Sequence, residues 1–271
     1  MKKKRGETKM IAITGDIHGH IDIHKLTKAN WPKGQTLTKR DTLIILGDFG
    51  LIWHDKEKAK KDEWWLKWLN QQPWTTLFID GNHENHTLLN SYTVTEWNGG
   101  KVHFIKDSII HLMRGQVFTL EGKKIFTYGG AASHDRMTRK ENISWWKDEL
   151  PTVDTENEAI VNLERVGNKV DLILTHDACQ KVCEVYGYRN DIDISYVYGQ
   201  QYRDVKNFFK YIEREVEFKQ WFMGHLHHEC IITNIEKKQK RQYVLLYDTI
   251  MELQDNLEFE GVPHRKISNL S

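Results

Sequence analysis

The 271-residue sequence has few of the residues that cross-link or interrupt a chain. Its three cysteines are an odd number, and a chain of this length does not need disulfides to fold, so we expect reduced thiols. Cys179 and Cys183 are four residues apart, but without a second pair they make a poor zinc site, and incidental burial is the favoured interpretation. Only 4 prolines occur, and no Pro/Ser/Gly-rich linker divides the chain. We therefore expect a single continuous domain over residues 10–250.

The sequence also has almost no net charge, with a formal value of +1, and it lacks a long hydrophobic run. Its 39 Lys and Arg residues nearly balance 38 Asp and Glu residues, so the total charge predicts no extended electrostatic binding to nucleic acid or an anionic membrane. The apolar run at 10–14 is far too short for a signal-peptide core or a membrane span. A cytoplasmic protein is expected, with a flexible Lys-rich segment at 1–9 and a polar tail at 251–271.

The chain does contain short apolar runs that alternate with amphipathic segments, the pattern of alternating strands and helices. Strands predicted at 10–14, 42–46 and 76–80, with helices at 20–29 and 56–70, form a βαβαβ beginning and hence a parallel sheet. Four runs that leave little room for helices should be antiparallel strands, at 102–105, 109–113, 116–120 and 124–128. Further helices are predicted at 156–166 and 204–214, and further strands at 171–175, 218–223, 231–235 and 243–247. The expected fold class is α/β, with mixed sheet flanked by helices.

Five of the predicted strands are followed by clusters of potential metal ligands. The clusters read GDIHG from Gly15, GDFG from Gly47, GNHE from Gly81, THD from Thr175 and GHLH from Gly224. The carboxyl ends of parallel strands are where α/β folds place their sites. Carboxylate, imidazole and amide oxygen ligands suit Mn²⁺, Fe²⁺ or Zn²⁺ better than the thiolate sets of structural zinc. The adjacent glycines allow close approach of backbone and substrate.

The spacing within two clusters adds a geometrical expectation. In an extended chain, residues two apart point to the same side, so Asp16 with His18, and His225 with His227, could each serve one site. A single Asp or His after a strand is more often a cap or a satisfied polar residue. Packing does not explain five such clusters in one order. The remaining histidines are predicted to be mainly surface or capping residues, with His20 and His228 as candidate outer-shell partners: His20, His24, His54, His86, His103, His111, His134, His228 and His264.

Taken together, the five clusters resemble the calcineurin-like metallophosphoesterase superfamily, from Gly15 to His227. The resemblance implies a two-sheet mixed β-sandwich flanked by helices in a four-layer αββα arrangement. It also implies two divalent metal ions, whether Mn, Fe or Zn, with a hydroxide between them as the nucleophile. One ion would be bound by Asp16, His18 and His227, the other by Asn82, His176 and His225, with Asp48 bridging them. His83 would contact the phosphate and help the leaving oxygen to accept a proton.

The second cluster departs from the pattern of one branch of the superfamily. In its protein Ser/Thr phosphatases, that motif continues into an aspartate that orients the catalytic histidine and an arginine that binds phosphate. Here Leu51 and Ile52 follow Gly50, so protein phosphatase activity is less favoured. A nuclease is the second alternative, although the chain has no evident basic stripe. A non-catalytic metal-binding scaffold is the third, and retention of all expected ligands argues against it.

Two stretches between the clusters mix arginine with aromatic residues, at 129–146 and 186–198. Guanidinium groups bind phosphate oxygens and aromatic faces stack on bases, so Arg136 and Arg189 are candidate substrate-binding residues. The alternative is that the aromatics pack beneath loops and the arginines are solvated. The predicted protein is a metal-dependent phosphoesterase that hydrolyses a diester or monoester of a small molecule, with a nucleotide as the favoured substrate.

Overall fold

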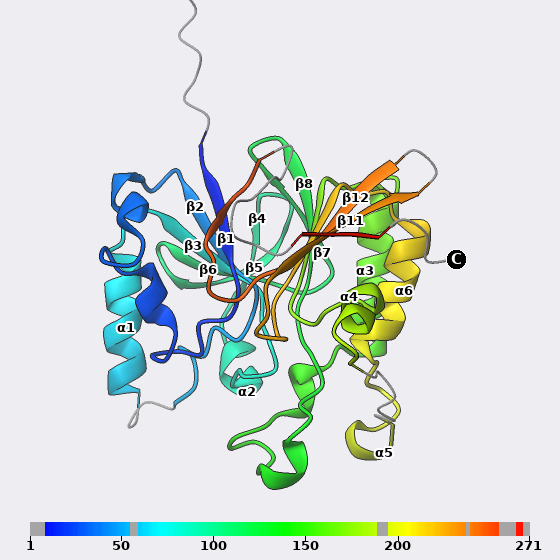
Figure 1. The fold of residues 1–271 in the computed structure, drawn as a ribbon. Coiled ribbons are helices and arrows are strands. Elements are labelled where there is room, and N and C mark those ends of the chain that lie inside the picture. Colours follow the sequence, from blue (N-terminus) through cyan, green and yellow to red (C-terminus); the bar gives the residue numbers. More distant parts are fainter. Residues whose placement is uncertain (1–8, 55–58, 189–194, 237–238, 255–263, 268–271) are drawn as a thin grey trace, which may run out of the picture.

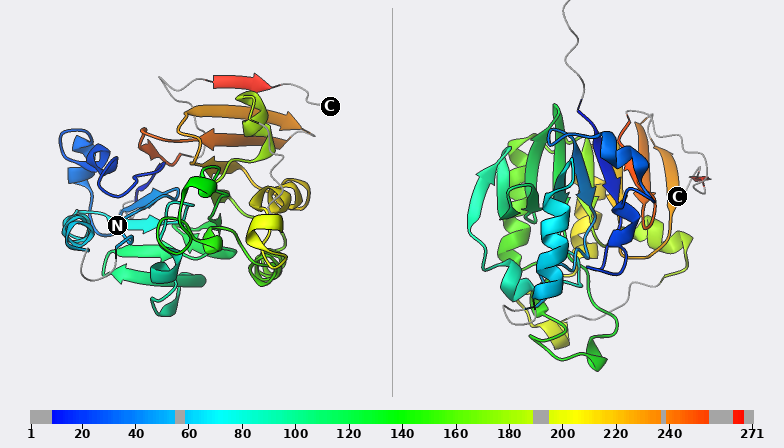
Figure 2. Two further views of the ribbon diagram at one scale, coloured as in Figure 1. Left: turned by 90° about the horizontal axis from the view of Figure 1, so that it is seen from below. Right: turned by 90° about the vertical axis from the view of Figure 1, so that its left-hand side faces the viewer.

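A computed structural model of the chain describes residues 9–54, 59–188, 195–236, 239–254 and 264–267. Within these residues, two seven-stranded sheets lie face to face between two groups of helices (Figures 1 and 2). The first sheet has the order β13-β1-β2-β3-β6-β5-β4 and the second β14-β11-β12-β10-β9-β8-β7. Most of the predicted N-terminal segment, residues 1–8, lies outside the described residues.

The strands of the first sheet are β1 (Ile11–Thr14), β2 (Thr42–Ile45), β3 (Thr75–Phe78), β4 (Val94–Trp97), β5 (Gly100–Lys106), β6 (Ile109–Leu112) and β13 (Met251–Glu252). Those of the second are β7 (Gln116–Leu120), β8 (Lys123–Tyr128), β9 (Leu172–Thr175), β10 (Gln220–Met223), β11 (Cys230–Glu236), β12 (Gln239–Leu245) and β14 (His264–Ile267). Both sheets mix parallel and antiparallel pairs. In the first sheet β6 pairs parallel with β3 and antiparallel with β5. In the second, β8 pairs parallel with β9 and antiparallel with β7.

The helices cover the outer faces of the two sheets. The first sheet is covered by α1 (Lys60–Asn70), together with the 3-10 turns η1 (Ile23–Leu26) and η2 (Pro32–Thr36) (Figure 1). The second is covered by α3 (Val153–Arg165), α4 (Gln180–Val185) and α6 (Val205–Glu215). The short helices α2 (His86–Leu89) and α5 (Ser195–Tyr198) and the turns η3 (Arg136–Thr138) and η4 (Lys147–Glu149) lie in connections. The expected α/β class and four-layer arrangement are confirmed.

The central strands read as unbroken apolar runs because both of their faces are buried. In β1, Ile13 faces the core between the two sheets, whereas Ala12 faces the layer that contains α1. The parallel register with β2 places Ile13 beside Ile44 and Ala12 beside Leu43, so both cores continue across the sheet. The three cysteines are free and buried, as expected. Among the described residues, no helix is both long and apolar enough to cross a membrane.

Several local elements differ from the predictions, and the short elements α2, α4, α5, β13 and β14 were not predicted. Residues 20–29 do not form an α-helix; η1 buries Ile23 and Leu26, and a spacing of three residues is satisfied by a 3-10 turn as well as by an α-helix. Strand β4 was not predicted, since three of its four side chains are exposed and it has no apolar pattern. The predicted antiparallel pairs β5–β6 and β7–β8 are present.

Candidate metal centre

All five clusters converge on one end of the sandwich. They follow β1, β2 and β3 of the first sheet and β9 and β10 of the second, at the lower edge of the sheets in Figure 1. Asp16, Asp48, Asn82 and His176 are at most 3 % exposed, although all four are polar. Burying this many polar groups is costly unless each one has a partner.

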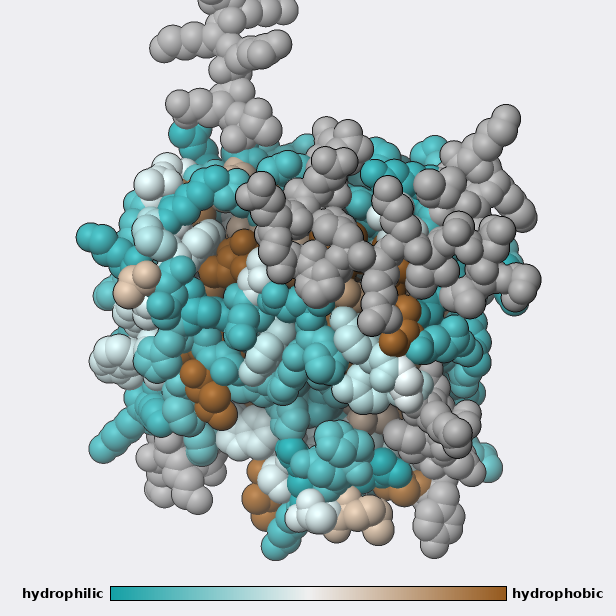
Figure 3. Space-filling model, viewed as in Figure 1, coloured by the Kyte–Doolittle hydropathy of each residue, from teal (hydrophilic) through white to brown (hydrophobic). Residues whose placement is uncertain are grey.

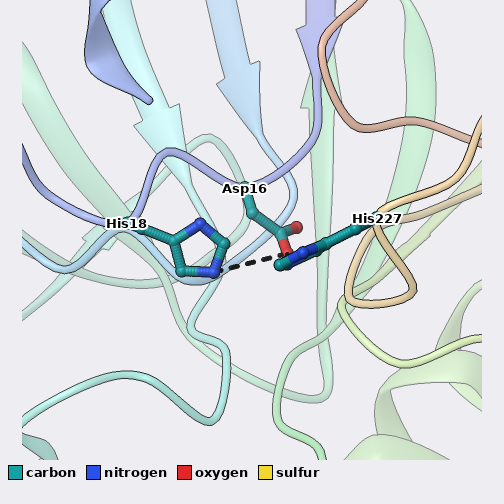
Figure 4. Close-up of side chains that lie close together, drawn as sticks. All are labelled: Asp16, His18 and His227. Atoms are coloured by element: carbon teal, nitrogen blue, oxygen red, sulfur yellow. Dashed lines mark ion pairs between the residues drawn. The ribbon is translucent and has the colours of Figure 1, made fainter. Parts of the chain in front are cut away.

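The first group of candidate ligands consists of Asp16, His18 and His227, which point toward one another in Figure 4. His227 Nε2 lies 3.2 Å and His18 Nε2 3.9 Å from Asp16 Oδ2. This carboxylate oxygen is buried, yet it finds no hydrogen-bond donor of suitable geometry among the described residues. A buried acceptor that faces two ring nitrogens without a hydrogen bond is what a shared cation would satisfy.

The second group consists of Asp48, His176 and His225, whose potential ligand atoms lie within 4.8 Å of one another. Asn82 joins it, because its Oδ1 lies 3.1 Å from His176 Nε2. His176 Nδ1 faces the backbone oxygen of Leu46 at 2.7 Å and can donate to it, which leaves Nε2 free to act as the candidate ligand nitrogen. The set of imidazoles, carboxylate and amide oxygen fits a divalent ion of borderline hardness.

Asp48 stands between the two groups. Its Oδ2 lies 3.3 Å from His18 Nε2, and its Oδ1 lies 3.3 Å from His176 Nε2. Its Oδ1 also accepts a hydrogen bond from the backbone N–H of His83 at 2.7 Å. One carboxylate therefore presents a different oxygen to each group, which suits a bridging ligand.

The backbone at these clusters is not extended. His18, Asp48, His225 and His227 all have positive φ values, of 42°, 45°, 68° and 51°. Neither pair therefore has the expected extended alternation. Asp16 and His18 nevertheless share one group, as predicted, whereas His225 and His227 belong to different groups. Non-glycine residues in this region are uncommon, and such strain concentrates at functional sites.

Three of the cluster glycines are required by close packing against the candidate ligands. A Cβ on Gly47 would lie 2.2 Å from His176 Nδ1. A Cβ on Gly81 would lie 2.1 Å from Asp48 Oδ1, and a Cβ on Gly224 would lie 2.4 Å from Asp16 Oδ1. All three distances are far below any van der Waals contact, so no other residue fits without displacing these side chains. The glycines predicted to allow close approach thus make room for the ligands themselves.

The carboxylates make the site strongly attractive to positive charge. Burial alone lowers the pKa of His18, but contact with Asp48 outweighs it and raises this pKa to about 9. For His176, burial is likewise outweighed by the charges of Asp48 and Asp16, which raise its pKa to about 10. Protons or metal ions can supply this charge, and bound metal ions displace protons from such ligands.

The side chain of Asn82 is oriented by a buried network that the sequence did not indicate. Its Nδ2 donates to Ser133 Oγ at 3.1 Å. Ser133 in turn donates from its backbone N–H and its hydroxyl to the two oxygens of Glu149, at 2.8 and 2.7 Å. Tyr198 also donates to Glu149. This network turns the amide so that its oxygen faces His176.

The ring of His83 is contacted by an arginine, and no carboxylate among the described residues is hydrogen-bonded to this ring. Arg139 Nη1 lies 3.1 Å from His83 Nδ1. Leu51 and Ile52, at the positions where the protein phosphatases have aspartate and arginine, are buried in the core beneath α1. The residue facing His83 therefore comes from another part of the chain, 56 positions away.

A cavity of about 420 Å³ opens beside the two groups. Asp48, Asn82, His83, His225 and His227 line it on one side, and Ala132, His134, Asp177, Cys183, Tyr188, Asp204, Lys206 and Leu226 line the rest. The face of the molecule seen in Figure 3 is mainly hydrophilic where described residues are visible, with small separate hydrophobic areas.

The two arginines predicted to bind substrate have different outcomes. Arg136 donates to the backbone oxygen of Ser133 at 2.9 Å and lies over the ring of Tyr198, and it is not among the described residues that line the cavity. Its role in substrate binding stays a prediction. Arg189 lies outside the described residues.

Three of the histidines that were predicted to be surface or capping residues are buried. His86, His103 and His111 are 2 %, 1 % and 3 % exposed; His86 and His111 face Asp80, and His103 faces His111. The prediction was wrong because isolated histidines on a strand or a short helix carry no spacing signal for burial. Their partners come from elsewhere in the chain.

Comparison with known proteins agrees with this geometry. The family model described as calcineurin-like phosphoesterase matches residues 9–229. None of the curated proteins matches the chain. The family match covers most of the sequence and includes all five clusters. The chain therefore belongs to the calcineurin-like phosphoesterase family, and it is a metal-dependent hydrolase that acts on phosphoester bonds.

Proposed function

We propose that the protein uses two divalent metal ions to hydrolyse the phosphate ester of a small molecule, with a nucleotide as the favoured substrate. The observation that carries this proposal is the position of Asp48. Its two carboxylate oxygens face different histidines, His18 and His176, each at 3.3 Å. A site for a single ion would not need one carboxylate shared between two groups of ligands. We also expect the protein to act in the cytoplasm.

The proposed roles of the residues follow from their places in the two ligand groups and beside the cavity. Bound divalent ions in such sites activate water and neutralise phosphoryl oxygens. Asp16, His18 and His227 would hold one ion, and Asn82, His176 and His225 the other. His83 lines the cavity beside Asp48, and we expect it to contact the phosphoryl group. Mn²⁺, Fe²⁺ and Zn²⁺ all suit this set of ligands.

The cavity supports a small substrate over a protein surface. Its volume of about 420 Å³ is in the range of small-molecule sites. Tyr188 lines it and is 44 % exposed, so its ring is accessible for stacking on a base. Protein phosphatase activity is less favoured, because Leu51 and Ile52 are buried and supply no phosphate-binding cation.

The test compares hydrolysis of a nitrophenyl phosphate monoester and the corresponding bis-nitrophenyl diester by Mn²⁺-loaded protein. Asp48→Asn is the matched variant, because it keeps the size of the side chain and removes the bridging charge. We expect turnover by the parent, a loss of at least about a hundredfold in the variant, and two bound ions per parent chain by elemental analysis.

The outcomes separate the alternatives. Preference for the diester would favour a phosphodiesterase, and preference for the monoester a phosphatase. Nucleotide esters would then be compared with a phosphopeptide and with single-stranded DNA. Metal binding without turnover of any ester would favour the non-catalytic scaffold, and one ion per chain would contradict the two-ion proposal.

A further inference from the structure

The contact between Arg139 and His83 is the most informative feature that the family resemblance did not predict. Arg139 follows the short turn η3, in the segment that lies below the sheets in Figure 1. Its Nη1 lies 3.1 Å from His83 Nδ1. His83 in turn lines the cavity, and its backbone N–H donates to Asp48. The arginine thus contacts the candidate metal centre through His83.

The guanidinium group is held in place from several directions. Its Nη2 pairs with Asp135 Oδ2 at 2.7 Å, and its Nη1 also donates to the backbone oxygen of Ser144 at 3.1 Å. The side chain is only 20 % exposed. These contacts leave the planar group little freedom, so its position is set by the segment and not by a substrate.

The chemistry of the two groups determines which ring nitrogen of His83 carries the proton. A guanidinium can donate hydrogen bonds but has no lone pair with which to accept one. Nδ1 of His83 must therefore be the acceptor, and the ring proton is on Nε2. A carboxylate partner would have the opposite effect, because it would accept from Nδ1–H and leave Nε2 with a lone pair.

We propose that Arg139 is a positioning residue that fixes the orientation and tautomer of His83, so that its Nε2–H donates a hydrogen bond to a phosphoryl oxygen of the substrate. This inference rests on the function proposed above. It differs from the role that the family resemblance implies, because this ring donates a hydrogen bond without transferring its proton. The leaving oxygen then takes its proton from solvent as the P–O bond breaks.

The kinetic test is a double-mutant cycle with Arg139→Ala, His83→Ala and the double variant. We expect each single variant to lower kcat roughly ten- to a hundredfold with little change in KM, because only the geometry of the transition-state contact is lost. Arg139→Ala should change kcat by less than about twofold when His83 is already absent. Lys140→Ala is the matched control, since it removes the same charge from the neighbouring, exposed position and should leave kcat within about twofold.

A second comparison tests the absence of proton transfer. A hydrogen bond to a phosphoryl oxygen contributes about equally to esters of good and poor leaving groups, whereas a proton donor matters most for poor ones. The loss caused by His83→Ala should therefore be similar for nitrophenyl and phenyl esters. A much larger loss with the phenyl ester would overturn this part of the proposal.

A spectroscopic test does not depend on turnover. The protonation of the ring nitrogens of His83 is read by ¹⁵N NMR of the metal-free protein, with His83→Ala used for assignment. We expect a proton on Nε2 alone in the parent, and a mixture of tautomers in Arg139→Ala. A proton on Nδ1 in the parent, or additive effects in the cycle, would overturn the inference. A parent without turnover whose Nε2–H tautomer is present would instead contradict the proposed function alone.

Discussion

At the scale of single residues, the orientation of Asn82 decides whether it can be a ligand at all. An amide can present either its oxygen or its nitrogen, and only the oxygen binds a cation. Ser133 accepts from Asn82 Nδ2, and Glu149 accepts both donors of Ser133, so the oxygen is left facing His176. Such outer partners matter nearly as much as the ligands.

We therefore predict that Ser133→Ala weakens the binding of one ion more than the binding of the other. The variant removes the acceptor that orients Asn82, and the affinity of the group that contains His176 should fall roughly 10- to 100-fold. The ion held by Asp16, His18 and His227 should be little affected. Titration of the metal-free protein with Mn²⁺, followed by calorimetry, would measure both steps. Thr138→Ala is a suitable control, since it removes an exposed hydroxyl from the same segment; equal weakening of both ions would contradict the prediction.

The candidate ligands could be predicted from the sequence, and the residues that contact them or His83 from distant parts of the chain could not. Asp16, Asp48 and His176 each sit in a short cluster after an apolar run, and five such clusters in one order form a recognisable pattern. Ser133 and Arg139 lie 51 and 56 positions from the residues they contact. Serine and arginine in a loop carry no local signal of such a role. Only the folded chain brings them to the site.

At the scale of elements, the prediction succeeded for segments whose buried residues recur at a regular helical or strand spacing. The helix predicted at 204–214 is α6 (Val205–Glu215), whose side chains Phe208, Phe209 and Ile212 are buried against the second sheet. Asp204 caps it by accepting from the backbone N–H of Lys206 at 2.9 Å. The η1 segment has too few buried residues for their spacing to distinguish a 3-10 turn from an α-helix. Strand β4 is mostly exposed, so its sequence shows no alternation of apolar and polar residues.

This packing predicts a large effect of one substitution in α6. Phe208 is fully buried, and the centroid of its ring lies 4.5 Å from the ring centroid of Tyr128. Phe208→Ala should lower the free energy of unfolding by about 3 to 5 kcal/mol, through lost burial and a residual cavity. Urea denaturation would measure it, with Asn207→Ala on the exposed face as the control. A loss below about 1 kcal/mol would mean that the second sheet does not depend on this helix for its cover.

At the scale of the whole molecule, the order of the strands links the two halves of the chain. The clusters come from both sheets, and the backbone N–H of His225, after β10, donates to Asp16, after β1, at 3.1 Å. The pairing of β3 with β6 and of β8 with β9 joins runs that are far apart or connected by helices. Local patterns predict the strands but not these partners. The arrangement of the sheets came from the family resemblance.

The buried histidines beside Asp80 give the whole fold a dependence on pH. Burial and the nearby charge of Arg114 lower the pKa of His86 to about 4. Burial and the neighbouring His111 lower the pKa of His103 to about 4 as well. The charges facing this cluster come from Asp80, which is paired with Arg114, and from Asp148. Both histidines are therefore neutral in the folded protein at pH 7.

In the unfolded chain these histidines titrate near their ordinary pKa of 6.5. Between about pH 6.5 and pH 4 the unfolded state therefore binds more protons than the folded state, and stability falls as the pH falls. Each histidine contributes a slope of about 1.4 kcal/mol per pH unit in this window. Above pH 7 their contribution is constant, because both states are neutral there.

We predict that His103→Gln makes the free energy of unfolding depend less steeply on pH, by the contribution of about one histidine. Urea denaturation of metal-free parent and variant at intervals from pH 7.5 to 4.5 would give the two curves, and their difference isolates His103 from the titration of the metal ligands. Thr95→Ala, on the exposed strand β4 that pairs with β5, removes no ionisable group and should leave the slope of the parent unchanged. Parallel curves for the parent and His103→Gln would show that His103 takes up its proton without unfolding the sheet. The pKa of this ring in the folded state would then lie near 6.5, and the burial of His103 on β5 beside β6 would not exclude water from the ring.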